Sequence, residues 1–163
     1  MKATENFQER RSPLAGLPAG SPMLSAPQPW GLTVVTGGVP KTAGTEAILP
    51  LGPERWLVVH EEQAEAPPSV IETDERQAST VDVGHGITRI RVSGIHSRAL
   101  LGSGISIDLH PQAFPAGESA ATAYRDVFVV VHNKGDDTYD LYTPRSYAAS
   151  LWEWLGDAEQ GIG

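Results

Sequence analysis

The sequence predicts an α+β fold with a mostly antiparallel sheet, two or three packed helices and an extended, proline-rich N-terminal arm. Short apolar runs rich in valine and isoleucine follow one another with turn residues between them, which is typical of antiparallel strands. Two or three segments interrupt these runs with apolar residues at helical spacing, most clearly near the C-terminus. Strands and helices in this order favour an antiparallel sheet packed against helices.

Composition and charge narrow the classes of function. The 163 residues are enough for one domain with its own core. A net charge of −8 and a pI near 5.0 argue against nucleic-acid or anionic-membrane partners, because both need a basic surface. Without cysteine, disulfides, thiol nucleophiles and cysteine-ligated metals are excluded. No apolar run reaches the about 20 residues that a membrane-spanning helix needs. The stretch that follows Arg10 and Arg11 is broken by prolines, so it does not look like a signal peptide. We therefore expect a cytoplasmic protein.

The N-terminal 29 residues form a segment that suits neither a helix nor a central strand, because prolines recur along it. We predict an extended arm over residues 1–29, a single α+β domain over 30–158 and a short tail over 159–163. In a free-standing protein the arm would be disordered. Alternatively it lies along a partner, and its apolar side chains are then the anchors: Leu14, Leu17, Met23 and Leu24.

The first half of the domain is predicted to contain three strands and a helix. Gly31 to Thr36 and Glu46 to Leu51 have strand composition. A turn over Gly52 to Glu54 connects the second of these to a strand over Trp56 to His60. A proline pair then provides a start for a helix over Ser69 to Gln77, with its acidic residues facing solvent.

The stretch VDVGHGITRIRVSG, Val81 to Gly94, joins a turn to a strand. Thr88, Ile90 and Val92 alternate with polar residues and are predicted to face the core. Val81 and Val83 have the opposite parity, so the register must change near Gly84 and Gly86.

Asp82 and His85 flank these glycines and have two interpretations. They could form an acid/base pair. We favour turn residues that satisfy backbone groups, because Asp commonly does so beside glycine. Arg89 and Arg91, on the other side of the strand, could bind an anion or pair with neighbouring carboxylates.

The second half is predicted as a short helix, three strands and a C-terminal helix. The short helix lies in IHSRALLGSG, with Leu100 and Leu101 facing inward. The strands cover Ser119 to Tyr124, Val127 to His132 and Tyr139 to Tyr142, with a hairpin turn over Asn133 to Asp137. The apolar run VFVVV predicts a fully buried central strand.

In the C-terminal helix, Thr143 is predicted to cap and Pro144 to occupy the first position. Its predicted core stripe consists of Tyr147, Leu151, Trp154 and Leu155. Trp152 lies beside that stripe and has two interpretations: it belongs to a deeper core, or it marks an interface.

No motif in the chain predicts chemistry. The histidines do not form HxxxH or HxH metal-ligand spacings. Ser103 in LGSGIS lacks the GxSxG spacing of a nucleophile elbow, and there is no GxGxxG or Walker loop. We therefore expect no catalytic, cofactor-binding or metal-binding residue on this chain.

Four stretches resemble, in order and spacing, the gamma-subunit family of heterotetrameric sarcosine oxidase: LGPERWLVV, VDVGHGITRIRVSG, DLHPQAFPAG and DLYTPRSYAASLWEWL. The similarity covers about Leu51 to Ala158 and the RRSPLA stretch near the N-terminus. The family pattern has a serine before the histidine where this chain has Gly84, which puts only the local turn in doubt. The stretch from Val81 also resembles a segment of the glycine-cleavage T-protein, which implies a T-protein-like, folate-binding-domain fold.

The resemblance implies a non-catalytic gamma subunit of an αβγδ flavoenzyme. That enzyme oxidatively demethylates sarcosine to glycine, transfers the methylene group to tetrahydrofolate and produces hydrogen peroxide. Its alpha, beta and delta subunits would be the partners; FAD, FMN and NAD would be carried by the two large subunits and zinc by the smallest. The resemblance also favours an arm ordered against a neighbouring subunit, with the four arm anchors and Trp152 as interface candidates.

Two alternatives stay open. The chain could be the equivalent subunit of a paralogous complex acting on another N-methyl amine, such as N-methylglutamate. It could also be an independent folate-binding, T-protein-like protein, in which Arg89 or Arg91 meets the glutamate tail of folate.

Overall fold

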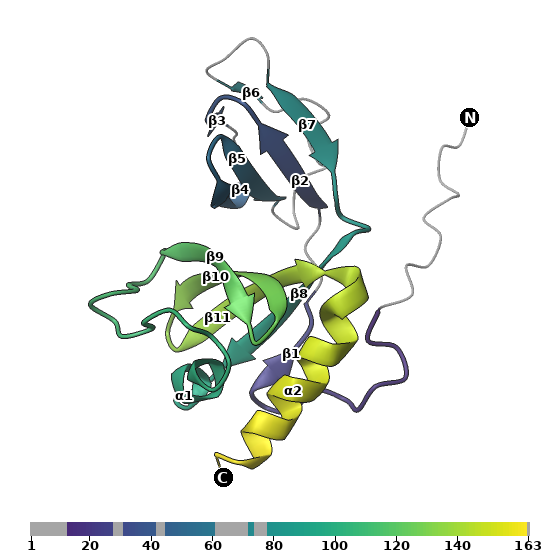
Figure 1. The fold of residues 1–163 in the computed structure, drawn as a ribbon, viewed down its shortest axis with the longest axis vertical. Coiled ribbons are helices and arrows are strands. Elements are labelled where there is room, and N and C mark those ends of the chain that lie inside the picture. The colour runs from purple at the N-terminus through teal and green to yellow at the C-terminus, as the bar shows by residue number, and fades with distance from the viewer. Residues whose placement is uncertain (1–12, 28–30, 42–44, 61–71, 74–77, 163) are drawn as a thin grey trace.

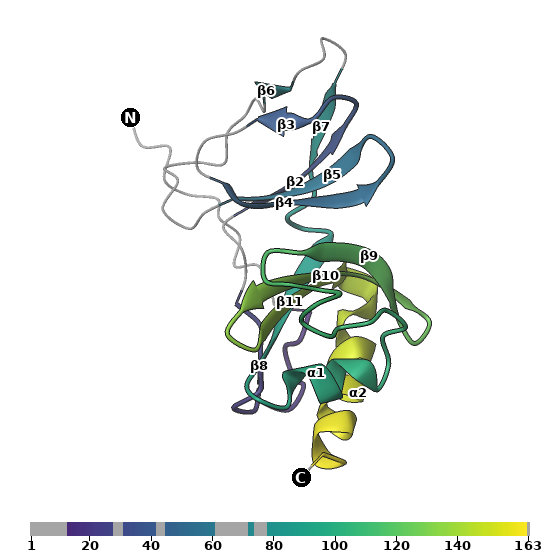
Figure 2. The same cartoon turned by 90° about the vertical axis from the view of Figure 1, so that its left-hand side faces the viewer.

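The computed structural model describes residues 13–27, 31–41, 45–60, 72–73 and 78–162. In these residues two antiparallel sheets lie face to face, and two α-helices cover the outer face of the larger sheet (Figures 1 and 2). Every strand pairing in the described part is antiparallel. The predicted α+β class with a mostly antiparallel sheet is therefore confirmed.

The larger sheet has five strands in the order β1-β8-β11-β10-β9. Its last three strands form a meander, and the three predicted strands are confirmed, but β10 continues to Gly135, so the hairpin turn is shorter than the predicted Asn133 to Asp137. The bounds are β1 Leu24–Ser25, β8 Ile87–Ser93, β9 Ser119–Tyr124, β10 Val127–Gly135 and β11 Thr138–Pro144.

The run VFVVV lies in β10, between β9 and β11, but one of its residues is not buried. Phe128 is 45% exposed, whereas its valines are buried. Its side chain is on the same face of the strand as Val130, which packs against the smaller sheet. The smaller sheet covers that face at Val130 and leaves it open at Phe128, so the predicted full burial was wrong at this position.

The smaller sheet has four strands in the order β4-β5-β2-β7, and its strand β4 lies over β9 and β10 (Figure 2). The predicted strands and the turn at Gly52 to Glu54 are confirmed, and Glu54 adopts a positive φ of 52° there. A two-stranded pair, β3 with β6, completes the described strands. The bounds are β2 Gly31–Thr36, β3 Pro40–Lys41, β4 Thr45–Gly52, β5 Arg55–His60, β6 Glu72–Thr73 and β7 Ser79–Asp82.

The predicted helix over Ser69 to Gln77 is wrong where the structure describes it. Glu72 and Thr73 form β6 and pair with Lys41 and Pro40 of β3. Pairing with a distant strand satisfies their backbone groups, and this outweighs the weak local signal of a proline pair. The other residues of the predicted helix lie outside the described part.

The structure does not show the register change predicted within Val81 to Gly94, because Val81, which was expected to face inward, is 57% exposed. Val81 is exposed in β7, whereas Thr88, Ile90 and Val92 are buried in β8. Between the two strands the chain makes a turn, where the N–H groups of Gly86 and Ile87 donate to the carbonyl oxygen of Val83 at 2.8 and 3.1 Å.

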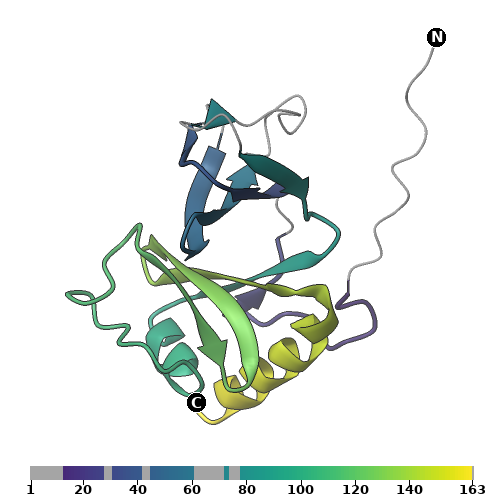
Figure 3. The same cartoon turned by 45° about the horizontal axis from the view of Figure 1, so that its top comes forward.

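Two helices, α1 (Ser97–Gly102) and α2 (Ala148–Gln160), pack against the larger sheet on the side away from the smaller one (Figure 3). The main core lies between these helices and the sheet, and a second apolar cluster lies between the two sheets. No helix in the described residues is long and apolar enough to cross a membrane.

The start of the C-terminal helix differs from the prediction. Thr143 and Pro144 belong to β11, a 3₁₀ turn (η1, Arg145–Tyr147) follows, and α2 begins only at Ala148. The hydroxyl of Thr143 donates to the carbonyl oxygen of Phe128 at 3.1 Å, so it serves the sheet and not a helix cap.

The later start also changes the buried stripe of the helix. The stripe is Ala148, Leu151, Trp152 and Leu155, which follow helical spacing, while Tyr147 is 50% exposed. Trp154 is partly buried, and the guanidinium of Arg125 lies 5.1 Å from its ring centre.

Candidate functional site

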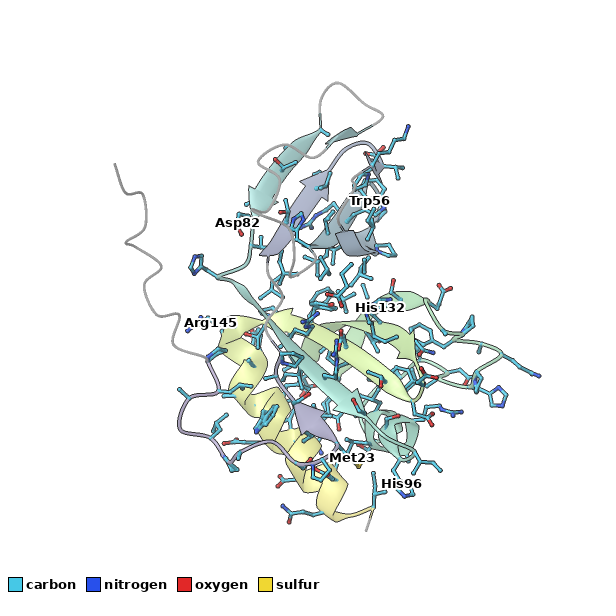
Figure 4. The ribbon with its side chains drawn as sticks, turned by 180° about the vertical axis from the view of Figure 1, so that it is seen from behind. Met23, Trp56, Asp82, His96, His132 and Arg145 are labelled. Carbon is cyan, nitrogen blue, oxygen red and sulfur yellow. The ribbon has the colours of Figure 1, made fainter. Side chains whose placement is uncertain are left out.

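The described part of the arm, residues 13–27, runs along its own chain, passing α2 and joining the edge of the larger sheet (Figures 1 and 4). Leu24 and Ser25 pair with Val92 and Arg91 as β1. The hydroxyl oxygen of Ser21 accepts hydrogen bonds from the N–H groups of Met23 and Leu24 at 3.1 and 3.0 Å, which shapes the turn into β1. The bounds predicted for the arm, the domain and the tail stay a prediction.

Trp152 holds the arm against α2. Its indole Nε1 donates to the carbonyl oxygen of Pro18 at 3.2 Å, and the residue is only 6% exposed. Gly20 permits this close passage, because a Cβ there would overlap the carbonyl oxygen of Leu24 and lie 3.4 Å from the Trp152 ring.

The five predicted interface residues therefore meet in one region of the structure. Leu14, Leu17 and Met23 are partly buried against the main core, and Leu24 is 3% exposed inside it. In the described chain these side chains contact their own domain, so a contact with another subunit stays a prediction. The sequence predicted these five residues as an interface, but it did not indicate that the arm packs against the C-terminal helix.

Two cavities flank the arm at Trp152. One, of about 400 Å³, lies among the arm residues themselves, between Leu14 and Ala26. The other, of about 380 Å³, lies between the arm and the C-terminal half of α2. We name the second one the acidic groove, because its walls combine the apolar side chains of Pro18, Leu24 and Trp152 with the carboxylates of Glu153, Asp157 and Glu159.

Arg91 and Asp140 form a partly buried ion pair on the face of the larger sheet that meets the smaller one. They are cross-strand neighbours in β8 and β11. Asp140 has no exposed side-chain surface and accepts hydrogen bonds from Arg91 Nε and Nη2 at 2.7 and 2.8 Å. This bidentate hydrogen bonding raises the pKa of Arg91.

Arg89 extends this pair to the smaller sheet and the arm. Its Nη1 donates to both carboxylate oxygens of Glu46 at 3.1 and 3.0 Å, and its Nε donates to the carbonyl oxygen of Pro27 at 2.7 Å. Lys134 Nζ lies 2.8 Å from Glu46 Oε1. Burial alone would raise the pKa of Glu46, but Lys134 and Arg89 lower it overall. The sequence interpretation that Arg89 and Arg91 pair with carboxylates is confirmed, although Arg89 is buried and not on an exposed face.

Buried polar atoms without partners adjoin this network. The Nδ1 atom of His132 and the hydroxyl of Tyr142 make no hydrogen bond to the described residues. His132 lies between the two sheets (Figure 4), and burial, together with the charge of Lys134, lowers its pKa. Burial likewise lowers the pKa of His60, whose Nε2 is 2.9 Å from Thr33 Oγ1.

Asp82 and His85 do not form an acid/base pair. The carboxylate of Asp82, at the junction of the two sheets (Figure 4), accepts a hydrogen bond from the Gly84 N–H at 2.8 Å, as expected of a turn residue. The side chain of His85 is exposed and makes no hydrogen bond to the described residues, so the expected contribution of His85 to the turn is absent. Within the described ranges, no group of three or more His, Cys, Asp or Glu residues could hold a metal ion.

Three comparisons place the chain among known proteins. The model of the sarcosine oxidase gamma subunit family matches residues 21–161. Sarcosine oxidase gamma subunits from Corynebacterium sp. strains U-96 and P-1 are 23% and 27% identical, over 85% and 80% of this chain and 68% and 63% of their own lengths. A chain of the heterotetrameric sarcosine oxidase from Corynebacterium sp. U-96, in complex with pyrrole 2-carboxylate, superposes with a TM-score of 0.73 at 19% identity. That match covers 94% of this chain and 96% of the other, and it shows a shared fold.

Proposed function

The chain belongs to the sarcosine oxidase gamma subunit family, and from this premise we propose that it is the gamma subunit of a heterotetrameric sarcosine oxidase. Its partners are the alpha, beta and delta subunits of the same complex. The family match over residues 21–161 carries the proposal. The fold shared with a chain of the Corynebacterium complex supports it.

In this proposal the subunit supports assembly and takes no part in the chemistry. The complex oxidatively demethylates sarcosine to glycine, transfers the methylene group to tetrahydrofolate and produces hydrogen peroxide. FAD, FMN, NAD and zinc are bound by the partner subunits. The charged side chains between the sheets support a structural role, because Arg89, Arg91, Asp140 and Glu46 neutralise one another. A cytoplasmic location stays a prediction from the sequence.

The arrangement of Arg89 and Arg91 counts against an independent folate-binding protein. Both guanidinium groups already pair with carboxylates of the same chain. Binding the glutamate tail of folate would require breaking these contacts inside a largely buried interface between the sheets. The paralogous complex remains an alternative, because a subunit without substrate contacts carries no information about which N-methyl amine is oxidised.

Co-expression with the alpha, beta and delta subunits of the same organism tests the proposal. We expect stoichiometric co-purification and sarcosine-dependent production of hydrogen peroxide by the purified complex. N-methylglutamate as substrate distinguishes the paralogous complex. A well-folded chain that stays monomeric in the presence of all three subunits would contradict the proposal, and tetrahydrofolate binding by the isolated chain would support the folate-binding alternative.

A further inference from the structure

The acidic groove carries an unbalanced negative charge. Glu153, Asp157 and Glu159 line it, and none of them forms an ion pair with a described residue. The groove lies along the C-terminal half of α2, where the helix dipole adds partial negative charge and the last turn contains no basic residue. The site therefore favours a cation.

The groove also has an apolar floor. Leu24 and the Trp152 ring lie beneath it, and Pro18 and Ala19 form the wall opposite the helix. Lysine and arginine side chains combine an apolar stem with a charged head. A floor of this kind beside carboxylates matches both parts of such a side chain.

Gly156 is the third observation. It lies inside α2, where glycine is a poorer helix former than alanine. A Cβ built on Gly156 has no described atom within 4 Å, so packing inside the chain does not require a glycine at this position. With Glu153 and Asp157 it lines the groove on one face of the helix. A missing side chain here leaves room for another backbone to approach the helix closely.

We propose that the acidic groove binds a basic, extended segment of a partner subunit of the sarcosine oxidase complex. A lysine or arginine of that segment places its stem on Trp152 and Leu24 and its charge among the carboxylates, while its backbone passes over Gly156. This inference rests on the proposed function, because it takes its occupant from the same complex. The interface thereby includes the groove beside the arm and not the arm alone.

The first test fills the groove without disturbing the fold. In the co-expressed complex, Gly156→Leu should weaken association by at least about tenfold, as expected at the centre of an interface. Gly156→Ala, which adds one methyl group, should weaken association less than Gly156→Leu does. Gly102→Leu is the matched control for added bulk, because the Cβ position of Gly102 is also open but lies on α1. Circular dichroism verifies that each variant chain is folded.

The second test removes the charge. Glu153→Gln combined with Asp157→Asn should weaken association and reduce its dependence on salt concentration. Glu118→Gln combined with Asp126→Asn makes the same change in net charge at exposed positions outside the groove, and should leave association unchanged. If both double variants behave alike, the groove is not where the charge acts, and the proposal is overturned.

The third test identifies the occupant. A photo-crosslinking amino acid in place of Gln160, which lines the groove, should capture a partner peptide that contains lysine or arginine. Capture of a second copy of this chain, or of its own residues 1–12, would overturn the proposal. If the wild-type chain associates and Gly156→Leu associates equally well, the groove proposal is contradicted and the proposed function is not. A wild-type chain that fails to associate contradicts the proposed function, and the groove proposal with it.

Discussion

Asp140 lies directly opposite Arg91 across β11 and β8 and holds its guanidinium through two hydrogen bonds of 2.7 and 2.8 Å. Asp140 is wholly buried, and Arg89 also approaches it to 3.7 Å. A single carboxylate therefore faces two arginines where the two sheets meet. Without Asp140, Arg91 would lose the carboxylate that it is bonded to, whereas Arg89 would keep Glu46 of the smaller sheet.

Neutralising Asp140 should destabilise the fold strongly. We expect Asp140→Asn to lower the free energy of unfolding by about 3 kcal/mol, the lower end for breaking a buried ion pair, because the amide oxygen still accepts a hydrogen bond. Asp137→Asn is the matched control, because Asp137 pairs with Arg98 on the surface with both side chains well exposed. This control should lose less than about 1 kcal/mol. Urea denaturation measures both, and equal losses would contradict a special role for Asp140.

Stability should fall as the pH falls below the pKa of unfolded histidine. Burial lowers the pKa values of His132 and His60, so protonation of these two imidazoles destabilises the folded chain. Their contribution is complete above the unfolded pKa of about 6.5, and is lost below it by up to about 1.4 kcal/mol per pH unit for each histidine. Glu46, whose pKa is also lowered, loses its contribution only below its usual range near 4.5.

The variant His132→Gln should remove part of this slope between about pH 7.5 and 5.5. His96→Gln, at an exposed position before α1 (Figure 4), is the control and should keep the wild-type slope. Urea denaturation across that range measures the slope. A His132→Gln chain that follows the wild-type curve at every pH would show that burial of His132 does not control the effect.

The strands that the sequence predicted well are those whose pattern is local. Ser119–Tyr124 matches the predicted bounds of β9, because alternation and a following turn mark it within a few residues. Glu72–Thr73 and the start of α2 were mispredicted because distant partners decide them. The strand β6 exists through its pairing with β3, and Thr143 joins the sheet by bonding to Phe128 of β10. No periodicity within those segments encodes such partners.

The candidate site was predictable in its parts and not in its arrangement. Apolar arm residues and a second tryptophan in the last helix were visible in the sequence, but Pro18 and Trp152 meet across 134 positions of the chain. The role of Asp140 was equally hidden, because its pairing with Arg91 follows from the strand order β8-β11. The sequence did not indicate that Gly156 lines a groove, because only the structure shows the open space at its Cβ position.

Gly104 should tolerate no side chain. A Cβ at this position would lie 2.5 to 2.8 Å from atoms of the Tyr124 ring, which is fully buried. We expect Gly104→Ala to cost about 1–3 kcal/mol, as overpacking of a core does. Gly102→Ala, two residues earlier in open space, should be neutral or stabilising by up to about 1 kcal/mol. Thermal denaturation compares the two, and a stable Gly104→Ala chain would mean that the Tyr124 ring can move aside.

The arm should loosen when Trp152 loses its hydrogen bond. In Trp152→Phe the carbonyl oxygen of Pro18 loses its indole donor, at a cost of about 1 kcal/mol. Because β1 contributes only two residues to the sheet, the arm should then open more often. The Ser93 N–H, which donates to the Met23 carbonyl oxygen at 2.9 Å, reports this opening through faster hydrogen exchange. Trp154→Phe, at a tryptophan that stacks with Arg125, is the control and should leave that exchange rate unchanged. Equal exchange rates in all three chains would mean that β1 pairing alone fixes the arm.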